Sequence, residues 1–277
     1  MKKIITGALI GVFALGLVGC SSKAENTISV ITREDGSGTR GAFTEIVGLI
    51  EDDVDTTTLE AIVHDGTGKV MTAVAGNKNS VGYISLGSLN DTVKAVSIDG
   101  VEPTTANVAS GEYKLARPFN IAYNDDLGEV EKDLINFIIS ANGAEIINSN
   151  GFISVEENAD YASTLPSGSI TIGGSTSVYP VMEILVEGYK ELNPNAEITI
   201  EGIGSSAGMK GVTEGIFDIG MASRELKDSE KEVLSHRAIA VDGIALVVNN
   251  ENELKNLTID NVKGMYNGQI TDFSELN

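Results

Sequence analysis

The 277-residue sequence is strongly acidic, with 40 aspartate and glutamate residues against 19 lysine and arginine residues and a formal net charge of −21. This balance argues against nucleic-acid binding, which requires a basic surface. A bound anion would need local cations and oriented dipoles that overcome the field of the whole chain. The single cysteine, Cys20, excludes an intrachain disulfide and a cysteine metal cluster.

The first residues have the pattern of an export signal. Lys2 and Lys3 precede an apolar run over residues 4–18, and the letters LVGC end at Cys20 as in a bacterial lipobox. A transmembrane helix is the alternative, but the run is short and rich in glycine. We predict a lipoprotein signal peptide over 1–19, a tether over 20–26, and a lipid such as palmitate on Cys20. The lipid would anchor the protein to the outer face of the cytoplasmic membrane.

Short apolar runs alternate with amphipathic runs along the rest of the chain. This alternation predicts an α/β fold with enough residues for two lobes. The predicted strands are 28–32, 81–86, 119–123, 170–172, 198–200 and 245–248. Helical spacing follows the letters GSGT, GGST and GIGSS, and another helical region over 134–147 is expected to break near Gly143.

Three of these helices begin at a turn rich in glycine and hydroxyl residues. The first amides of a helix have no partner within it, and the helix dipole makes that end partly positive, so such a turn can bind an anion. Arg33 would add a fork of charged donors next to the first turn. The alternative is that the hydroxyls are ordinary helix caps. The turn hydroxyls are those of Ser37, Thr39, Ser175, Thr176, Ser177, Ser205 and Ser206.

The turns belong to longer segments that resemble a known family. "GGSTSVYPVMEILVEGYKELNPNAEITIEGIGSSAGMKGVTEGIFDIGMASREL" is similar to the N-terminal half of the phosphate-binding proteins of bacterial ABC phosphate importers. "ISVITREDGSGTRGAF", "GKVMTAVAGNKNSVGYIS" and "YKLARPFNIAYN" are similar to their C-terminal half. The halves stand in the opposite order here. We interpret this as a circular permutation joined near Gly168, and an error of sequence assembly is the alternative.

The resemblance implies a type II periplasmic-binding-protein fold, with two α/β lobes, a hinge and a ligand cleft between the lobes. Residues 27–104 with 243–277 would form one lobe and residues 105–242 the other, with hinge crossings near 103–106 and 242–243. The resemblance also implies a monomer that binds inorganic phosphate, delivers it to an ABC permease, and uses no cofactor, metal or catalysis. The implied phosphate ligands are Arg33, Ser37, Gly38, Thr39, Thr176, Ser177 and Ser205.

Other residues are implied to support the site. Asp35 would hold Arg33 in place, and Ser175 and Ser206 would add hydroxyls. Several family members have an aspartate after the second binding turn that accepts a proton from phosphate, but Arg224 stands at that position here. Selectivity against sulfate or arsenate is therefore in question, because sulfate is rejected when it leaves a buried acceptor unpaired. Asp242 is a candidate substitute acceptor.

Different classes of function also fit parts of the sequence. "GSSAG" matches the nucleophile elbow of α/β-hydrolases, with Ser206 as nucleophile, Asp218, and His64 or His236 as base. "DGTGKV" lacks the first glycine and the final hydroxyl of a P-loop, and "EDDVD" lacks the glycine and distal glutamate of a calcium loop. An envelope phosphate sensor that is not coupled to transport is a further alternative.

Overall fold

The computed structural model describes residues 26–155 and 159–276 of the chain. The predicted signal peptide, Cys20 and most of the tether lie outside the described residues. Within the described ranges, none of the helices has the length and apolar character needed to cross a bilayer.

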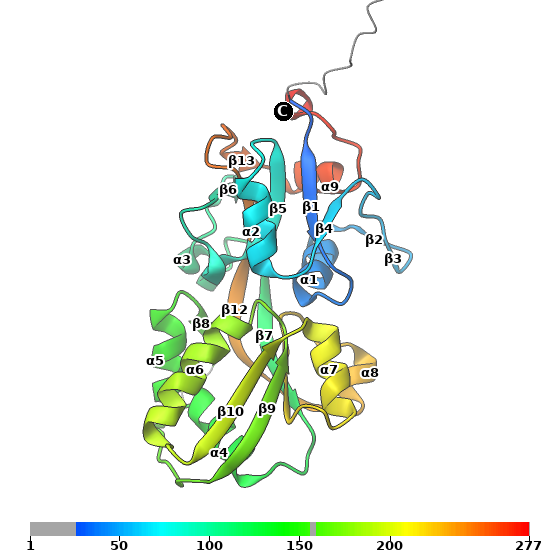
Figure 1. Ribbon diagram of the computed structural model, residues 1–277. Helices are drawn as coiled ribbons and strands as arrows, with labels where there is room; N and C mark the ends of the chain where they lie inside the picture. The colour runs from blue at the N-terminus through cyan, green and yellow to red at the C-terminus, as the bar shows by residue number, and fades with distance from the viewer. Residues whose placement is uncertain (1–25, 156–158, 277) are drawn as a thin grey trace, which may run out of the picture.

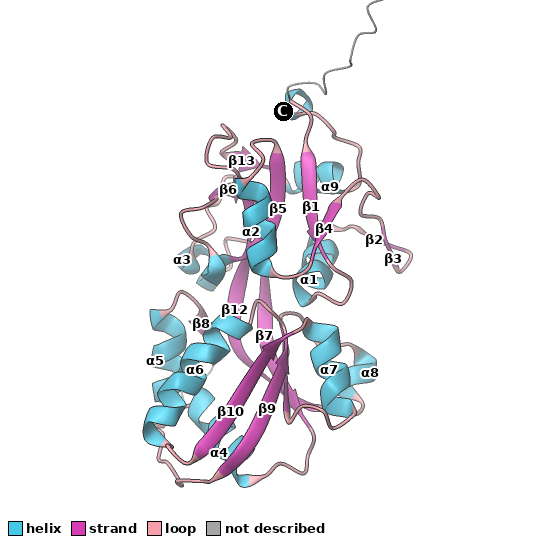
Figure 2. Ribbon diagram, in the orientation of Figure 1, coloured by secondary structure: helices cyan, strands magenta, loops and turns pink. Residues whose placement is uncertain are grey.

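Figures 1 and 2 show an α/β molecule whose strands run through its centre and are flanked by helices. The strands are β1 (Ser29–Arg33), β2 (Ile50–Glu51), β3 (Val54–Asp55), β4 (Ile62–His64), β5 (Ser80–Ser85), β6 (Lys94–Ile98), β7 (Ala116–Tyr123), β8 (Ile153–Ser154), β9 (Gly168–Gly174), β10 (Ala196–Gly202), β11 (Ile219–Ala222), β12 (Ser235–Val248) and β13 (Asn256–Leu257). The helices are α1 (Gly38–Val47), α2 (Thr67–Ala75), α3 (Thr105–Ala109), α4 (Glu129–Ile138), α5 (Ala141–Ser149), α6 (Tyr179–Leu192), α7 (Ser205–Thr213), α8 (Asp228–Lys231), α9 (Ile259–Tyr266) and the 3-10 turns η1 (Leu86–Ser88) and η2 (Phe273–Glu275).

Two lobes share one sheet, with the strand order β10-β9-β11-β7-β12-β5-β1-β4. Lobe one contains β1–β6, α1–α3, β13 and α9, and lobe two contains β7–β11 and α4–α8 (Figure 1). β12 belongs to both lobes, because its first part pairs with β7 and its last part pairs with β5 and β6. This architecture confirms the α/β class and the two-lobe expectation.

Each lobe has its own apolar core. In lobe two, α6 presents Val181, Met182, Leu185 and Tyr189 at helical spacing, and all four are buried against the sheet. In lobe one, Phe43 of α1 stacks on Tyr83 of β5 with ring centroids 3.9 Å apart. Burial of these faces holds the helices that open onto the lobe junction in fixed positions.

The helical region expected over 134–147 does break near Gly143, at residues 139–140. The break lies between α4 and α5, where Ser140 caps α5 by accepting a hydrogen bond from the amide of Gly143 at 3.3 Å. A Cβ on Gly143 would lie 2.2 Å from the carbonyl oxygen of Ile138. The glycine is therefore explained by the close approach of the two helices rather than by a helix end.

The packing moves one expected lobe boundary. Val108, Tyr113 and Leu115 are buried in the core of lobe one, although residues from 105 onward were expected in lobe two. We therefore propose the first crossing near Ala116, where β7 begins, instead of at 103–106. On β12 the pairing changes from β7 to β5 between Gly243 and Ile244, beside the crossing expected at 242–243.

Candidate functional site

The three glycine- and hydroxyl-rich turns meet at the junction between the lobes. The turn before α1 comes from lobe one, whereas the turns before α6 and α7 come from lobe two (Figure 1). Thr39 Oγ1 and Ser177 Oγ lie 2.8 Å apart across the junction, and the amide of Ser206 donates to the carbonyl of Gly36 at 3.1 Å. Helix termini that are far apart in the sequence therefore point at one small region.

Arg33 is the cation of this region. It ends β1, and only 1% of its surface is exposed. Its Nη2 donates to Thr176 Oγ1 of lobe two at 3.0 Å. The amide of Arg33 donates to the hydroxyl of Tyr83 at 3.2 Å, which fixes the end of the strand. Arg33 Nη1 is buried and has no hydrogen-bond partner among the described residues, so one charged donor is left over.

Glu34, and not Asp35, holds Arg33 in place. Its carboxylate accepts from Arg33 Nε and Nη2 at 2.7 Å each. The side chain of Asp35 is 98% exposed and pairs with Arg40 at 3.0 Å, so the role expected for Asp35 is wrong. Burial alone would raise the pKa of Glu34, but the bonds from Arg33 and from the amide of Gly66 hold that pKa below its usual value.

Several turn hydroxyls are also structural caps. Ser37 Oγ caps α1 by accepting from the amide of Arg40 at 3.3 Å. Ser175 Oγ accepts from the amide of Ser177 at 3.2 Å and lies 2.9 Å from Ser223 Oγ. A hydroxyl oxygen that accepts in this way still has a proton to donate. Capping and anion binding are therefore compatible at Ser37, whereas Ser175 already donates its proton to Ser223 Oγ.

Gly38 lies where α1 approaches α7 most closely. A Cβ at this position would lie 2.4 Å from Ser205 Oγ and 2.7 Å from Ser223 Oγ. Ser205 Oγ in turn accepts from the amide of Ser223 at 3.2 Å. Glycine is thus required for the two helix termini to meet. All seven expected ligand residues lie in this region, so we call Arg33, Ser37, Gly38, Thr39, Thr176, Ser177 and Ser205 the junction site.

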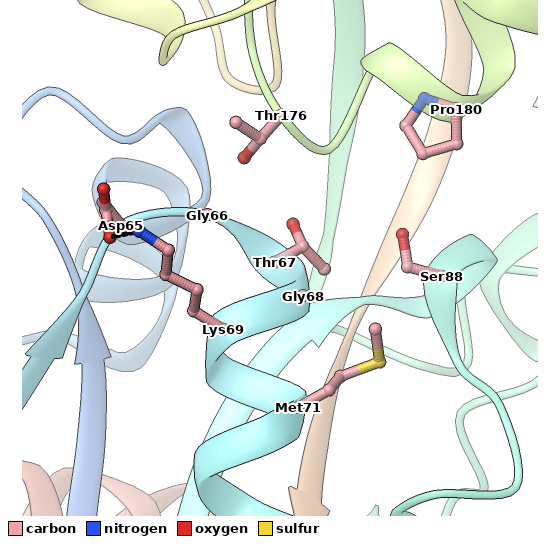
Figure 3. Close-up of a pocket in the computed structure, with 9 residues that line it drawn as sticks. All are labelled: Asp65, Gly66, Thr67, Gly68, Lys69, Met71, Ser88, Thr176 and Pro180. Atoms are coloured by element: carbon pink, nitrogen blue, oxygen red, sulfur yellow. Dashed lines mark hydrogen bonds and ion pairs between the residues drawn. The ribbon is translucent and has the colours of Figure 1, made fainter.

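A fourth helix terminus, which the sequence analysis did not assign to the site, joins it. Thr67 at the start of α2 is buried, and its Oγ1 lies 3.3 Å from Ser177 Oγ. Thr67 also lines a pocket that opens beside the junction site, where Thr67 and Ser88 lie on one side and Thr176 and Pro180 on the other (Figure 3). The signal was the "DGTG" turn, which was rejected as a P-loop without being considered as a further helix start.

Arg224 does not face the junction site as a free cation. Its Nη1 and Nη2 each donate to Glu230 at 2.8 Å, and Nη2 also donates to Ser206 Oγ at 3.2 Å. The hydrolase alternative is not supported by this arrangement, because the partner of Ser206 is a guanidinium that cannot accept a proton. Asp218 instead accepts from the amide of Thr171 at 2.6 Å.

Asp242 is fully engaged at the lobe junction. Its Oδ2 accepts from Arg117 Nη2 at 3.0 Å, and its Oδ1 accepts from the amide of Gly87 at 3.2 Å. Both side chains of the ion pair are 1% exposed. Burial raises the pKa of Asp242, and the positive charge of Arg117 opposes this increase. Asp242 was expected as an acceptor from its position near the hinge, whereas Arg117 has no local signal in the sequence.

Known proteins resemble this chain over most of its length. A family model described as a PBP superfamily domain matches residues 2–142 and 159–276. The phosphate-binding protein PstS 2 of Streptococcus pneumoniae (strain TIGR4) is 44% identical over 99% of both chains, and that of Streptococcus agalactiae (strain 2603 V/R) is 39% identical over 97% of this chain and 96% of its own. The chain belongs to the phosphate-binding-protein family.

A solved structure agrees with this assignment. The crystal structure of a phosphate-binding protein of a phosphate ABC transporter from Streptococcus pneumoniae TIGR4 is 45% identical, with a TM-score of 0.73. It covers 91% of this chain and 100% of that one. This periplasmic-binding-protein fold is the one expected for a phosphate-binding protein. Within the described ranges, no cluster of three or more histidine, cysteine, aspartate and glutamate side chains could hold a metal ion.

Proposed function

We propose that the protein captures inorganic phosphate in the junction site, outside the cytoplasm, and delivers it to an ABC importer. The observation that supports this most directly is Arg33, whose buried Nη1 lies among the hydroxyls and helix termini of both lobes without a partner in the described chain. A buried charged donor with no acceptor is unfavourable, and a tetrahedral oxyanion supplies the missing acceptor. Membership of the phosphate-binding-protein family supports the same ligand and the same importer.

Capture would couple ligand binding to closure of the lobes. Arg33 and Thr39 come from lobe one, whereas Thr176, Ser177 and Ser205 come from lobe two. An anion bonded to both sets favours the closed arrangement over the open one, which is a shift between two populations. Each charge-assisted hydrogen bond contributes roughly 1.5–3 kcal/mol. We expect binding to persist at moderate salt, because buried bonds are poorly screened.

Selection of phosphate would not depend on a carboxylate in this chain. Asp242 is engaged by Arg117 and the amide of Gly87, and Arg224 replaces the family aspartate. The hydroxyls of Thr39 and Ser177 can accept a hydrogen bond as well as donate one. They can therefore pair with the proton of phosphate, which sulfate does not have near neutral pH.

The first experiment is calorimetric titration of residues 21–277 with phosphate, followed by sulfate, arsenate and phosphonates. We expect tight phosphate binding and much weaker sulfate binding. Equal binding of phosphate and sulfate would contradict the selectivity argument while leaving the anion site intact. A folded sample that binds none of these anions would refute the proposed function and favour a sensor or another module. Loss of phosphate uptake on gene deletion would distinguish transport from sensing.

We also propose that the chain is circularly permuted relative to phosphate-binding proteins such as the PstS protein of Bacillus subtilis, and that lipid on Cys20 holds it at the membrane. The ends of the described chain are neighbours: the amide of Ile28 donates to Thr271 at 2.8 Å, and that of Phe273 to Asn26 at 3.0 Å. The PstS protein of Bacillus subtilis aligns over 40% of this chain and 38% of its own, as expected when halves are exchanged. The streptococcal relatives align over almost the whole chain, which argues against an assembly error.

The permutation is tested by joining the present ends with a short linker and opening the chain near Gly168, at the start of β9. A variant of that kind that folds and binds phosphate like the parent would support the proposal. The control is the parent with its ends joined by the same linker and no new opening. If that control is stable but the reopened variant does not fold, the proposal is contradicted. Radiolabelled palmitate that enters the wild-type protein but not Cys20→Ser would support the lipid anchor, and equal labelling of both would contradict it.

A further inference from the structure

A second buried arginine lies beside the junction site. Arg117 is the second residue of β7 and directly faces Asp242 of β12 in the sheet register. Only 3% of its surface is exposed. Its Nη2 donates to Asp242 and its guanidinium lies over the ring of Phe119 at 5.4 Å, but its buried Nε and Nη1 have no hydrogen-bond partner in the part of the chain that the structure describes. An ion pair that only locked two strands together would not leave two charged donors unused.

Arg117 and Arg33 belong to the same sheet, on β7 and β1, with β12 and β5 between them. Burial lowers the pKa of Arg117 to about 10, with Asp242 opposing this shift and the positive charge of Arg33 adding to it. Tyr83 of β5, which hydrogen-bonds the amide of Arg33, also acts on Arg117. Arg117 remains protonated near neutral pH. Two buried cations therefore lie on the central strands of the sheet, where the lobes join.

The carboxylates next to these arginines do not use all of their donors. Glu34 takes two donors of Arg33, and Asp242 takes one donor of Arg117. Three guanidinium nitrogens in the described chain stay unpartnered: Nη1 of Arg33 together with Nε and Nη1 of Arg117. Buried charged donors of this kind favour a ligand that has several acceptor oxygens and more than one negative charge.

We propose that Arg117 is a second cation of the phosphate site, oriented by Asp242, and that it favours the dianionic form of phosphate. This inference rests on the proposed function of the junction site. Arg117 would contact the ligand through Nε or Nη1 once phosphate enters. Asp242 is a positioning residue, because both of its oxygens are already occupied by Arg117 and Gly87. The pair would also place a ligand contact on the crossing strands, so that ligand binding acts directly where the lobes join.

Three variants test the proposal: Arg117→Gln, Arg117→Lys and Asp242→Asn. Inorganic phosphate is titrated by calorimetry in mildly acidic and mildly basic buffer, and thermal unfolding is followed in parallel. Arg117→Gln should weaken binding by about 30-fold, which corresponds to one lost charge-assisted contact. The loss should be larger in basic buffer, where the dianion predominates. Arg117→Lys should recover part of the affinity, since it keeps the charge.

Asp242→Asn separates ligand contact from structural support. It removes the negative charge next to Arg117, so it should lower thermal stability while phosphate affinity falls less than in Arg117→Gln. The matched control is Asp133→Asn, a buried carboxylate that bonds Tyr189 in lobe two and should lower stability without changing affinity. If Arg117→Gln does not fold, Arg117→Lys decides: the proposal expects a partial loss of phosphate affinity that is larger in basic buffer, and an affinity within threefold of the parent at both pH values would overturn it.

Two results would overturn the inference. The first is an Arg117→Gln protein that binds phosphate within threefold of the parent at both pH values. The second is an equal loss of affinity in Arg117→Gln and Asp242→Asn, because that result would make the pair a structural lock alone. In both cases the parent still binds phosphate. A parent that binds no phosphate would refute the proposed function instead, so the two failures are distinguishable.

Discussion

Two arginine–glutamate pairs flank the junction site, one from each lobe, and their uses differ. In lobe one, Glu34 accepts from Nε and Nη2 of Arg33 at 2.7 Å. In lobe two, Glu230 accepts from Nη1 and Nη2 of Arg224 at 2.8 Å. Both are forked pairs of similar length with little exposed surface on the arginine. The chemistry of the pair is the same in the two places.

The difference lies in the donors that remain. Arg33 keeps a buried Nη1 without a partner among the described residues, whereas Nη1 of Arg224 also donates to the carbonyl of Glu225 and Nη2 to Ser206. Arg224 is thus committed to holding the start of α7, while Arg33 retains capacity for a ligand. An arginine becomes a binding residue through the donors that its protein partners leave unused, and its burial and charge alone do not decide this.

Replacement of Arg33 tests this contrast most strongly. Arg33→Ala should weaken phosphate binding by about 100-fold, because it removes the charged donors of the site and leaves Glu34 without its partner. Calorimetric titration measures the change. The control is Arg40→Ala on the following helix α1, whose guanidinium pairs with the exposed Asp35 and with Asp55 and meets only the backbone carbonyl of Arg33. An Arg33→Ala change below threefold would contradict the assignment of Arg33 to the site.

A methyl group at Gly38 tests the close approach of the two lobes. Gly38→Ala should weaken phosphate binding by about tenfold, because the new Cβ displaces the hydroxyl of Ser205 and so removes about one hydrogen bond. Gly41→Ala is the control on the same helix, since its Cβ would meet only Arg224 Cδ at 3.5 Å. Titration of both variants gives the result, and equal affinities for the two would count against a site at this contact.

Replacement of Arg224 should affect the fold more than the ligand. In Arg224→Gln we expect phosphate affinity within about threefold of the parent but a lower thermal midpoint, because the forked pair with Glu230 is lost. Titration and thermal unfolding of one sample measure both quantities. A large loss of phosphate affinity with unchanged stability would reverse the roles that we assign to the two arginines.

Acid should weaken the Arg224–Glu230 pair of lobe two, and this is the smallest of the expected effects. Burial alone would raise the pKa of Glu230, but the bonds from Arg224 hold that pKa below its usual value of 4.5. The pair therefore stabilises the fold above that value and loses this contribution as the pH falls through the lower, folded pKa. Such a pair is worth up to about 1 kcal/mol, or about 2–4 °C in thermal midpoint. Glu230→Gln should flatten the acid branch of a midpoint–pH profile, and an unchanged branch would contradict the prediction.

The three helix starts were predictable from the sequence because each depends on local features. A strand followed by glycine, hydroxyl residues and an amphipathic run specifies a helix start, and the family resemblance brings three such starts together. The choice between Glu34 and Asp35 was not predictable, because adjacent carboxylates point to different sides of the chain and only tertiary packing decides which one reaches Arg33. A turn motif identifies the position of a site but not the orientation of each side chain.

Arg117 was missed for a related reason. In the letters "LARPFN" it is one of two polar residues among apolar ones, which is typical of a surface-facing position. Its burial follows from its pairing with Asp242, more than a hundred residues later in the chain. The extent of β12 was underestimated likewise, because its first residues include the polar Ser235, His236 and Arg237. Long-range strand pairing, and not local pattern, determines both features.

The fourteen residues of β12 have a consequence for how the molecule unfolds. Separate domains joined by a linker can melt one at a time, but here one strand lies inside both halves of the sheet. Opening either half would strip backbone partners from the same strand and expose an edge in the other. The lobes can therefore move against each other during their working cycle and yet denature as a single cooperative unit.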